Sequence, residues 1–447
     1  MKLEKVTVSS LFGVFDHEIP FKVESGITIV IGENGLGKTV ILEAINALFD
    51  KKYSFFGSLE FEAFNFYFSN GEIWQLTKTS NKDDFTLSIG RDSTNRPVKK
   101  IKTHKIFQAN DSFNHKMRIR DREILRRHEM ERFFRSENGY YRDEHEFEVE
   151  LHHRRLMESK YRHHRYAEES ELNVPQWYLD GINKVNVRLI ETQRIITAKE
   201  SGSDSYVNNL NKCSQELKEM IDLASRKSSK VATELDSTYP NRLVKKLRQG
   251  SQNTFDELNK ALAKLDDRRK QFSSSGLAVK VSDSDLLQIN ETQENLVNVL
   301  KLYIDDSHKK LDPYEELSQK IKLFKGIVNK RFKHKTLEVE QDKGLSFRST
   351  IVKNSEGLFD IIPPSKLSSG EQHELILFYK LIFNSQSNDL ILIDEPELSL
   401  HISWQNKFIK DLKEVSSIND ISIVIATHSP DIIDENWDLK VELLGVE

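Results

Sequence analysis

The stretch GENGLGKT, Gly32 to Thr39, decides the fold of this chain. It matches G-x-x-x-x-G-K-[ST], the pattern of a phosphate-binding loop whose backbone N–H groups close around phosphate oxygens. The apolar run GITIVI before it favours a strand, and VILEAINALF after it has helical spacing. A strand before and a helix after are the context that this loop requires. The sequence therefore predicts an α/β nucleotide-binding domain.

The loop residues are the first candidates for contact with a nucleotide. We expect Lys38 to reach the β- and γ-phosphate oxygens and Thr39 to place its hydroxyl on Mg²⁺. The expected ligands are therefore a nucleoside triphosphate and Mg²⁺, and the family resemblance given below implies that the nucleotide is ATP. A chance match in a surface loop is the alternative, and both flanking patterns argue against it. The full expected set is Gly32, Glu33, Asn34, Gly35, Leu36, Gly37, Lys38 and Thr39.

A second strand carries two adjacent carboxylates. In LILIDEPE, residues 390–397, an apolar run ends at Asp394 and Glu395. A carboxylate at such a strand end can bind Mg²⁺, which is the role expected for Asp394. Glu395 can then act as the general base toward an attacking water. An acidic turn without chemistry is the alternative reading.

Two further polar residues follow apolar strands. His428 ends the run IVIATHSP, residues 423–430, and would meet the γ-phosphate at the carboxyl edge of a parallel sheet. Gln193 follows VRLIE and is a candidate to sense Mg²⁺ or water, with Gln108 in KIFQ as its competitor. The expected catalytic set is Glu395, His428 and Gln193, and the expected metal ligands are Thr39, Asp394 and Gln193.

The heptapeptide LSSGEQH, Leu367 to His373, precedes the helical run ELILFYKLIF. Free backbone N–H groups at such a helix start suit an anion. The alternative is a plain helix cap, in which Ser369 satisfies local N–H groups. A second anion-binding turn in a chain that already has a phosphate loop needs an explanation.

In their order, GENGLGKT, LSSGEQ, DEPELSLH and THSP resemble the ATP-binding-cassette ATPases of the SMC, RecF and OLD-like branch. The resemblance implies an ATPase head with a P-loop, a largely parallel sheet, an N-terminal antiparallel β-subdomain and helical insertions. It also implies that Ser368, Ser369 and Gly370 close over ATP held by another copy, with Leu400 and His401 along the seam. The chain would then form a homodimer or a higher homo-oligomer. Glu371 replaces the usual final Gln of the motif, or shifts it by one place to Gln372.

The pattern along the chain predicts an ATPase head that is divided by insertions. In the helical part, breaks are expected at Tyr239-Pro240, at residues 273–276 and at Pro313, which leaves helices of two to four heptads at most. The expected segments are 1–110, the N-terminal half of the head with the P-loop; 111–180, a charged His- and Arg-rich helical insertion; 181–202, the strand and turn that hold Gln193; 203–333, a helical lobe; and 334–447, the C-terminal half of the head.

The composition restricts the surroundings of the protein. A net charge of −4 means that any contact with nucleic acid must be local. Cys213 is the single cysteine, so no internal disulfide forms and a reducing cytoplasm is the simplest compartment. No apolar run approaches the ~20 residues that span a bilayer, so no membrane partner is expected.

LFGVFDHEIPF, residues 11–21, and VRLIETQRI, residues 187–195, look like the ATPases of bacterial defence operons. The nearest resemblance is to the ATPase subunits of PARIS anti-phage systems, with those of Septu second. It implies a homo-oligomer that holds a TOPRIM-type (or HNH) nuclease until a phage-encoded trigger protein is sensed. About 17 residues follow Pro430, so we expect that nuclease to be a separate chain.

The histidines of the 111–180 segment leave three readings open: a metal or nuclease site, a surface that binds a partner or trigger, or a plain solvated insertion. They include His145, His152, His153, His163 and His164.

Two rival functions compete with the defence reading. A DNA-repair ATPase like RecF would clamp duplex DNA and would need a basic stripe, for which NRLVKKLRQ and KLFKGIVNKRFKHK are candidates. The ATP subunit of a transporter is disfavoured, because the ~130 helical residues between Ser203 and Phe332 are too many for its short helical lobe.

Overall fold

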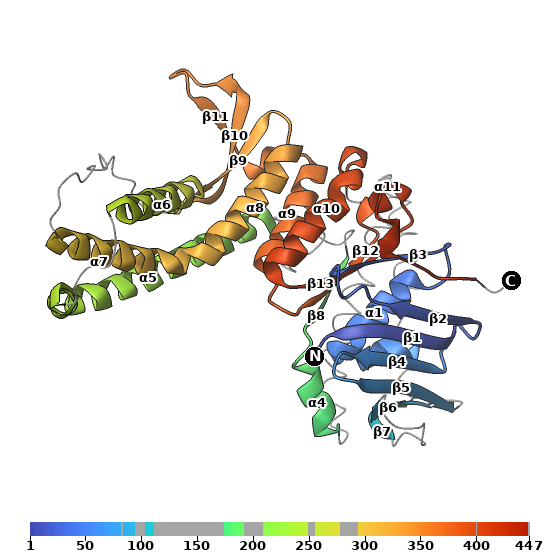
Figure 1. Cartoon of the computed structure of the whole chain (residues 1–447). Coiled ribbons are helices and arrows are strands. Elements are labelled where there is room, and N and C mark those ends of the chain that lie inside the picture. The colour runs from blue at the N-terminus through green and yellow to red at the C-terminus, as the bar shows by residue number, and fades with distance from the viewer. Residues whose placement is uncertain are drawn as a thin grey trace, which may run out of the picture. The chain divides into compact units, whose positions relative to one another are not determined.

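A computed structural model describes residues 1–81, 84–93, 103–110, 174–191, 209–248, 255–277, 294–398 and 400–445 (Figure 1). The chain forms two compact units. Unit 1 comprises Met1–Ile190, Ser387–Pro396 and Asp420–Glu447, and unit 2 comprises Glu191–Gln386 and Glu397–Asn419. Most of the predicted insertion 111–180 lies outside the described residues, as does Gln193.

Unit 1 contains a six-stranded sheet in which every pair of neighbours is antiparallel. Its order is β2 (Phe15–Pro20), β1 (Leu3–Leu11), β4 (Ala63–Phe68), β5 (Glu72–Asn81), β6 (Asp84–Ser93) and β7 (Thr103–Asn110). Two hairpins, with turns at Gly13 and at Asn70-Gly71, join β1 to β2 and β4 to β5. This confirms the antiparallel N-terminal β-subdomain.

The apolar strands that precede the candidate site residues form a second sheet in unit 1. Its order is β14 (Lys440–Glu442), β3 (Ile27–Ile31), β13 (Ser422–Ala426), β12 (Leu390–Asp394) and β8 (Val187–Glu191). The pairs β14–β3, β3–β13 and β13–β12 are parallel. Helix α1 (Lys38–Phe49) packs against β12 and β13, and its apolar face joins one core with both sheets. The predicted α/β class with a largely parallel sheet is thus confirmed.

Unit 2 consists mainly of helices, seen together in green to red in Figure 1. Helices α5 and α6 both pack on α7, and α8 packs on α9 and α10. A three-stranded antiparallel sheet has the order β11, β10, β9. The bounds are α5 (Asn209–Arg248), α6 (Phe255–Ser274), α7 (Glu294–Leu311), α8 (Glu315–Arg331), β9 (Lys335–Glu340), β10 (Gly344–Lys353), β11 (Phe359–Ile362), α9 (Ser369–Phe383) and α10 (Ile402–Asn419).

Short elements complete the described residues. Two are α-helical: α4 (Gln176–Ile182) and α11 (Pro430–Ile433). The 3-10 turns are η1 (Tyr53–Gly57), η3 (Asp312–Tyr314), η4 (Pro364–Lys366), η5 (Pro396–Leu398) and η6 (Trp437–Leu439). None of the described helices is both long and apolar enough to cross a membrane.

The helix break predicted at Tyr239-Pro240 is wrong, because α5 runs through Pro240 for 40 residues and exceeds the predicted limit of four heptads. The proline removes the N–H that would donate to the carbonyl of Asp236, four residues earlier. Arg242, two residues after the proline, donates from Nη2 to the carbonyl of Leu235 at 2.8 Å. The same guanidinium holds Asp306 of α7 in a bidentate pair at 2.5 and 2.7 Å. The breaks predicted at residues 273–276 and at Pro313 are confirmed, since α6 ends at Ser274 and η3 separates α7 from α8.

Candidate nucleotide-binding site

The loop between β3 and α1 is shaped by its last glycine. Gly37 is the N-cap of α1 and has φ +88°, a left-handed conformation that glycine adopts without steric cost. A Cβ atom at this position would lie 2.6 Å from Leu11 Cδ2, so a side chain here would also require Leu11 of the neighbouring strand to move. No side chain of the described residues caps this helix, so its first N–H groups face the loop.

Lys38 is held inside the loop. Its side chain is buried, and its Nζ donates to the carbonyls of Gly32 at 2.8 Å and Glu33 at 2.9 Å. A buried ammonium surrounded by oxygen acceptors fits a site for phosphate oxygens. The loop residues present therefore suit the triphosphate of ATP.

Thr39 and Asp394 come together from the two halves of the sequence. Thr39 lies in the first turn of α1, Asp394 is the last residue of β12, and Thr39 Oγ1 donates to Asp394 Oδ1 at 3.0 Å. A hydroxyl beside a carboxylate is the pair of oxygen donors that suits Mg²⁺ next to a nucleotide. The donors fit the metal that an ATPase needs.

Glu395 and His428 follow neighbouring parallel strands, and their side chains meet. His428 Nε2 lies 3.9 Å from Glu395 Oε1, and each side chain is about one third exposed. Glu395 has φ +44°, and its N–H donates to the carbonyl of Ala426 at 2.9 Å. A non-glycine residue in this conformation costs about 1–3 kcal/mol, and such residues concentrate at functional sites.

The turn before α9 is a capping box that belongs to unit 2. Ser368, and not Ser369, is its N-cap: the N–H of Glu371 donates to Ser368 Oγ at 3.3 Å. In return, the N–H of Ser368 donates to Glu371 Oε2 at 2.8 Å. Lys335 of β9 donates to the same carboxylate at 2.7 Å. These contacts give Glu371 a structural role at the position where the family motif usually has Gln.

Between Leu398 and Ile402, the exposed residues differ from those expected. Leu400 is buried within the protein, whereas His401 is exposed and its Nδ1 lies 2.8 Å from Ser403 Oγ. The large apolar side chains on the surface are instead Leu398, 59% exposed, and Ile402, 67% exposed. Neither residue was predicted from the sequence. The available signal was the presence of Leu398 and Ile402 close to the acidic residues of DEPELSLHI.

The remaining candidates are Gln193, the histidines of the 111–180 segment and Gln108. Gln193 and the histidines of the 111–180 segment lie outside the described residues. Gln108 is exposed on β7 and so belongs to a different sheet from Asp394. Among the described residues, no three His, Cys, Asp or Glu side chains gather as a metal cluster.

His17 of β2 was missed in the sequence. It is 5% exposed, and its Nε2 lies 2.9 Å from the carbonyl oxygen of Leu36 in the phosphate loop. A histidine between Phe15 and Ile19, at an inward-facing place of an alternating strand, was the available signal.

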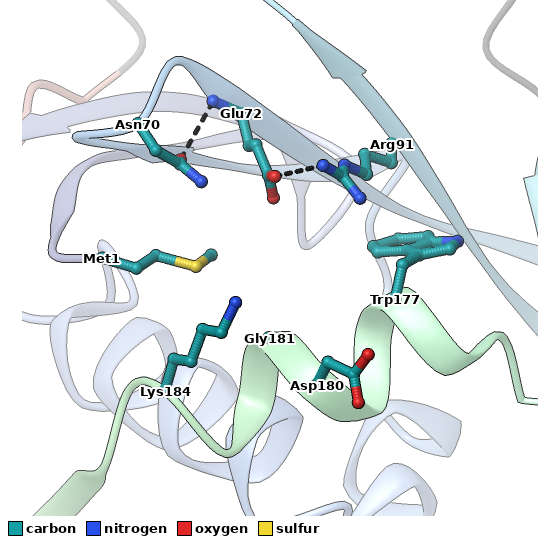
Figure 2. A pocket seen from close by; sticks show the side chains of 8 residues that line it. All are labelled: Met1, Asn70, Glu72, Arg91, Trp177, Asp180, Gly181 and Lys184. Carbon is teal, nitrogen blue, oxygen red and sulfur yellow. Dashed lines mark hydrogen bonds and ion pairs between the residues drawn. The ribbon is translucent and has the colours of Figure 1, made fainter.

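A separate cavity of about 370 Å³ lies between β5, β6 and α4 (Figure 2). Glu72 pairs with Arg91, whose guanidinium lies 5.8 Å from the ring centre of Trp177. Asp180 and Lys184 also line it, so both charges are represented equally. No residue of the phosphate loop lines this cavity. The balanced charges of its lining favour neither an anionic nor a cationic ligand.

A comparison with protein families agrees with this geometry. A family profile described as an AAA ATPase domain matches residues 1–433. Among solved structures, the SMC head domain of Pyrococcus furiosus bound to the C-terminal domain of ScpA is 11% identical, with a TM-score of 0.33, over 97% of this chain and 91% of that one. The SMC head domain of Thermotoga maritima is 12% identical, with a TM-score of 0.34, over the whole of both chains. These scores are too low to carry an argument, and no curated protein matches the chain. Because the family profile covers nearly all of its length, this chain belongs to the AAA ATPase domain family.

Proposed function

We propose that this ATPase is the sensor and scaffold subunit of a bacterial anti-phage defence complex. It binds and hydrolyses ATP at sites shared between copies of itself, and it holds a separate TOPRIM-type or HNH nuclease until a phage trigger is sensed. The observation that carries the ATP site is the meeting of Thr39 with Asp394 and of Glu395 with His428 at the end of one parallel sheet. The defence role rests on the resemblance of the sequence.

Within the site, each residue has a distinct task in hydrolysis. Bound ATP and Mg²⁺ supply the phosphoanhydride bond and the cation that offsets the charge developing on the phosphate oxygens. Lys38 and the N–H groups of the loop bind and orient the phosphates, while Thr39 and Asp394 hold the metal. Glu395 Oε1 orients the attacking water and accepts its proton. His428, 3.9 Å from that oxygen, contacts the γ-phosphate side of the site.

A shared site would give the turn before α9 a function beyond capping the helix. Unit 2 contains the turn Ser368–Gly370 but no phosphate loop, and Ser368 is exposed at the start of α9. Exposed Leu398 and Ile402 provide apolar surface beside His401 in the same unit. Apolar side chains of this size on a surface suit an interface between proteins. We therefore assign the turn to the ATP of a second copy.

A mixing experiment tests the shared site. Lys38→Ala removes the phosphate-binding lysine, and Ser369→Arg blocks the turn, so each variant alone should hydrolyse ATP poorly. Mixed together, the two should regain part of the activity, because one of their two shared sites is then intact. A chain with both substitutions, mixed with Lys38→Ala, is the control and should regain none. Absence of recovery at every mixing ratio contradicts the shared site.

The DNA-clamp alternative keeps only part of its basic surface. In KLFKGIVNKRFKHK, Arg331 is buried against Glu374 and Asp411, and Lys335 pairs with Glu371. Lys325 donates to the carbonyl of Ser274 at 2.8 Å. Lys322, Lys330 and Lys333 of that stretch are exposed and remain as its support. So do Lys245, Lys246 and Arg248 at the end of α5.

Two measurements separate the readings. Recovery of a nuclease with the tagged chain expressed beside its neighbouring reading frames supports the defence role. Duplex DNA binding that needs ATP and is lost on reversing the α5 charges supports the clamp instead.

A further inference from the structure

His17 connects the antiparallel sheet to the phosphate loop. It lies on β2 between Phe15 and Ile19, with its ring 5.8 Å from that of Phe15 at an interplanar angle of 12°. Its Nε2 lies 2.9 Å from the carbonyl oxygen of Leu36. Because this buried imidazole contacts the phosphate loop, we asked whether it does more than fill the core.

The chemistry of the contact fixes the tautomer. A carbonyl oxygen only accepts hydrogen bonds, so Nε2 of His17 must carry the proton and donate it. Burial lowers the pKa of His17 below the usual value, although the bond to Leu36 and the charge of Asp16 oppose this shift. The ring therefore acts as a neutral, directional donor at neutral pH.

The hydrogen bond from His17 also fixes the orientation of the peptide group between Leu36 and Gly37. No described peptide bond is cis, and in a trans peptide the C=O of one residue and the N–H of the next point in opposite directions. Because the Leu36 carbonyl is turned toward β2, the N–H of Gly37 is turned away from β2. The side chain of Leu36 is also buried, so both ends of the residue are held.

Gly37 is where this orientation matters. It is the N-cap of α1, and its neighbour Lys38 holds the ammonium inside the loop. We propose that His17 is a positioning residue of the phosphate loop, which donates to the Leu36 carbonyl and so aims the Gly37 N–H at the phosphates of ATP. This inference rests on the proposed nucleotide site.

Replacing the ring with and without a donor tests the proposal. His17→Leu fills similar space without a donor, whereas His17→Gln retains a side-chain N–H. We expect His17→Leu to bind a fluorescent ATP analogue at least about tenfold more weakly than the wild type. In this variant the Gly37 N–H is no longer aimed at the charged phosphates, so that hydrogen bond is weakened. The KM for ATP should rise more than kcat falls, and His17→Gln should bind within about threefold of the wild type.

Matched controls separate positioning from packing. Ile19→Val alters the next inward residue of β2 and should bind like the wild type. If His17→Leu does not fold by circular dichroism, His17→Met replaces it as the variant without a donor. Wild-type affinity in a folded variant without a donor, or equal losses in it and in His17→Gln, would overturn the positioning role. Wild-type affinity of Lys38→Ala would instead overturn the nucleotide site itself, so the two failures are distinguishable.

Discussion

The hydroxyl of Thr39 donates to the carboxylate of Asp394 at 3.0 Å, although 355 residues separate the two in the sequence. The contact arises because β3 and β12 both flank β13 in the parallel sheet and α1 packs against β12. The carboxyl ends of parallel strands meet at one edge, which is where ligands of such sheets bind. Two distant motifs thus form one pair of oxygen donors.

Thr39 should be needed for its hydroxyl rather than for its shape. Thr39→Val keeps the branched side chain but removes the oxygen, so we expect the apparent affinity for Mg²⁺ to fall at least about tenfold. Thr39→Ser keeps the hydroxyl and should stay near the wild type. Titration of ATPase activity with Mg²⁺ measures both, and equal affinities in Thr39→Val and Thr39→Ser would contradict a metal role.

Glu395 should be needed for its carboxylate during hydrolysis and not for binding. Glu395→Gln keeps the size and hydrogen-bonding capacity of the side chain but removes the base, so turnover should fall at least ~10²-fold. ATP affinity should stay within a few-fold of the wild type. Single-turnover hydrolysis and equilibrium binding separate the two quantities, and unchanged turnover would assign the base to another residue.

The backbone of Glu395 offers a second test at the same position. Its φ of +44° is strained for any residue with a Cβ, so Glu395→Gly relieves that strain while Glu395→Gln retains it. We expect Glu395→Gly to be at least as stable as Glu395→Gln in urea unfolding, and equally inactive. A glycine variant less stable by more than ~1 kcal/mol would show that the side chain itself stabilises the fold.

Much of unit 1 could be predicted from local patterns. Gly32–Thr39 lies between a strand and a helix as expected, and the turn at Asn70-Gly71 connects β4 to β5. These features depend on residues close in sequence, so periodicity and turn chemistry are sufficient to find them. The contact of His17 with Leu36 depends on the packing of β2 beside the loop, which no local pattern reports.

The errors share the same cause. A proline inside a helix usually ends or kinks it, but α5 continues through Pro240. Arg242, two residues later, pairs with Asp306 of α7, 64 positions away in the sequence. Leu400 was expected at an interface from the resemblance alone, whereas packing within the protein buries it. In both cases the tertiary environment decides the outcome, against a local rule for Pro240 and against the family pattern for Leu400.

The Pro240 turn should show energetic coupling to Arg242. Pro240→Ala restores a backbone N–H and should raise the free energy of unfolding by about 1–3 kcal/mol. Arg242→Ala should lower it by about 1–3 kcal/mol, because it removes hydrogen bonds to Leu235 and Asp306. The cost of Arg242→Ala should be smaller once Pro240 is replaced. A double-mutant cycle in urea measures this coupling, and strict additivity would show that Arg242 and Pro240 affect stability independently.

The capping box of α9 should make stability depend on pH through Glu371. Burial alone would raise the pKa of Glu371, but the hydrogen bonds from Lys335 and Ser368 and the charge of Lys335 lower it below 4.5. A carboxylate whose pKa is lowered by folding stabilises the protein above its unfolded pKa. That stabilisation is lost as the pH falls from 4.5 through the folded pKa.

Two variants at this box should therefore behave differently in acid. Glu371→Gln retains the hydrogen-bonding groups of a capping box but carries no charge, so its stability should change less than that of the wild type below pH 4.5. Lys335→Met removes the ammonium that lowers the pKa of Glu371, so its acid loss should begin at higher pH. Glu356→Gln, an exposed substitution near the β10–β11 turn, is the control and should follow the wild type. Urea unfolding between pH 3 and 7 measures all four proteins. Parallel curves for Glu371→Gln and the wild type would mean that the Lys335–Glu371 pair does not stabilise the turn from Ser368 to Gly370.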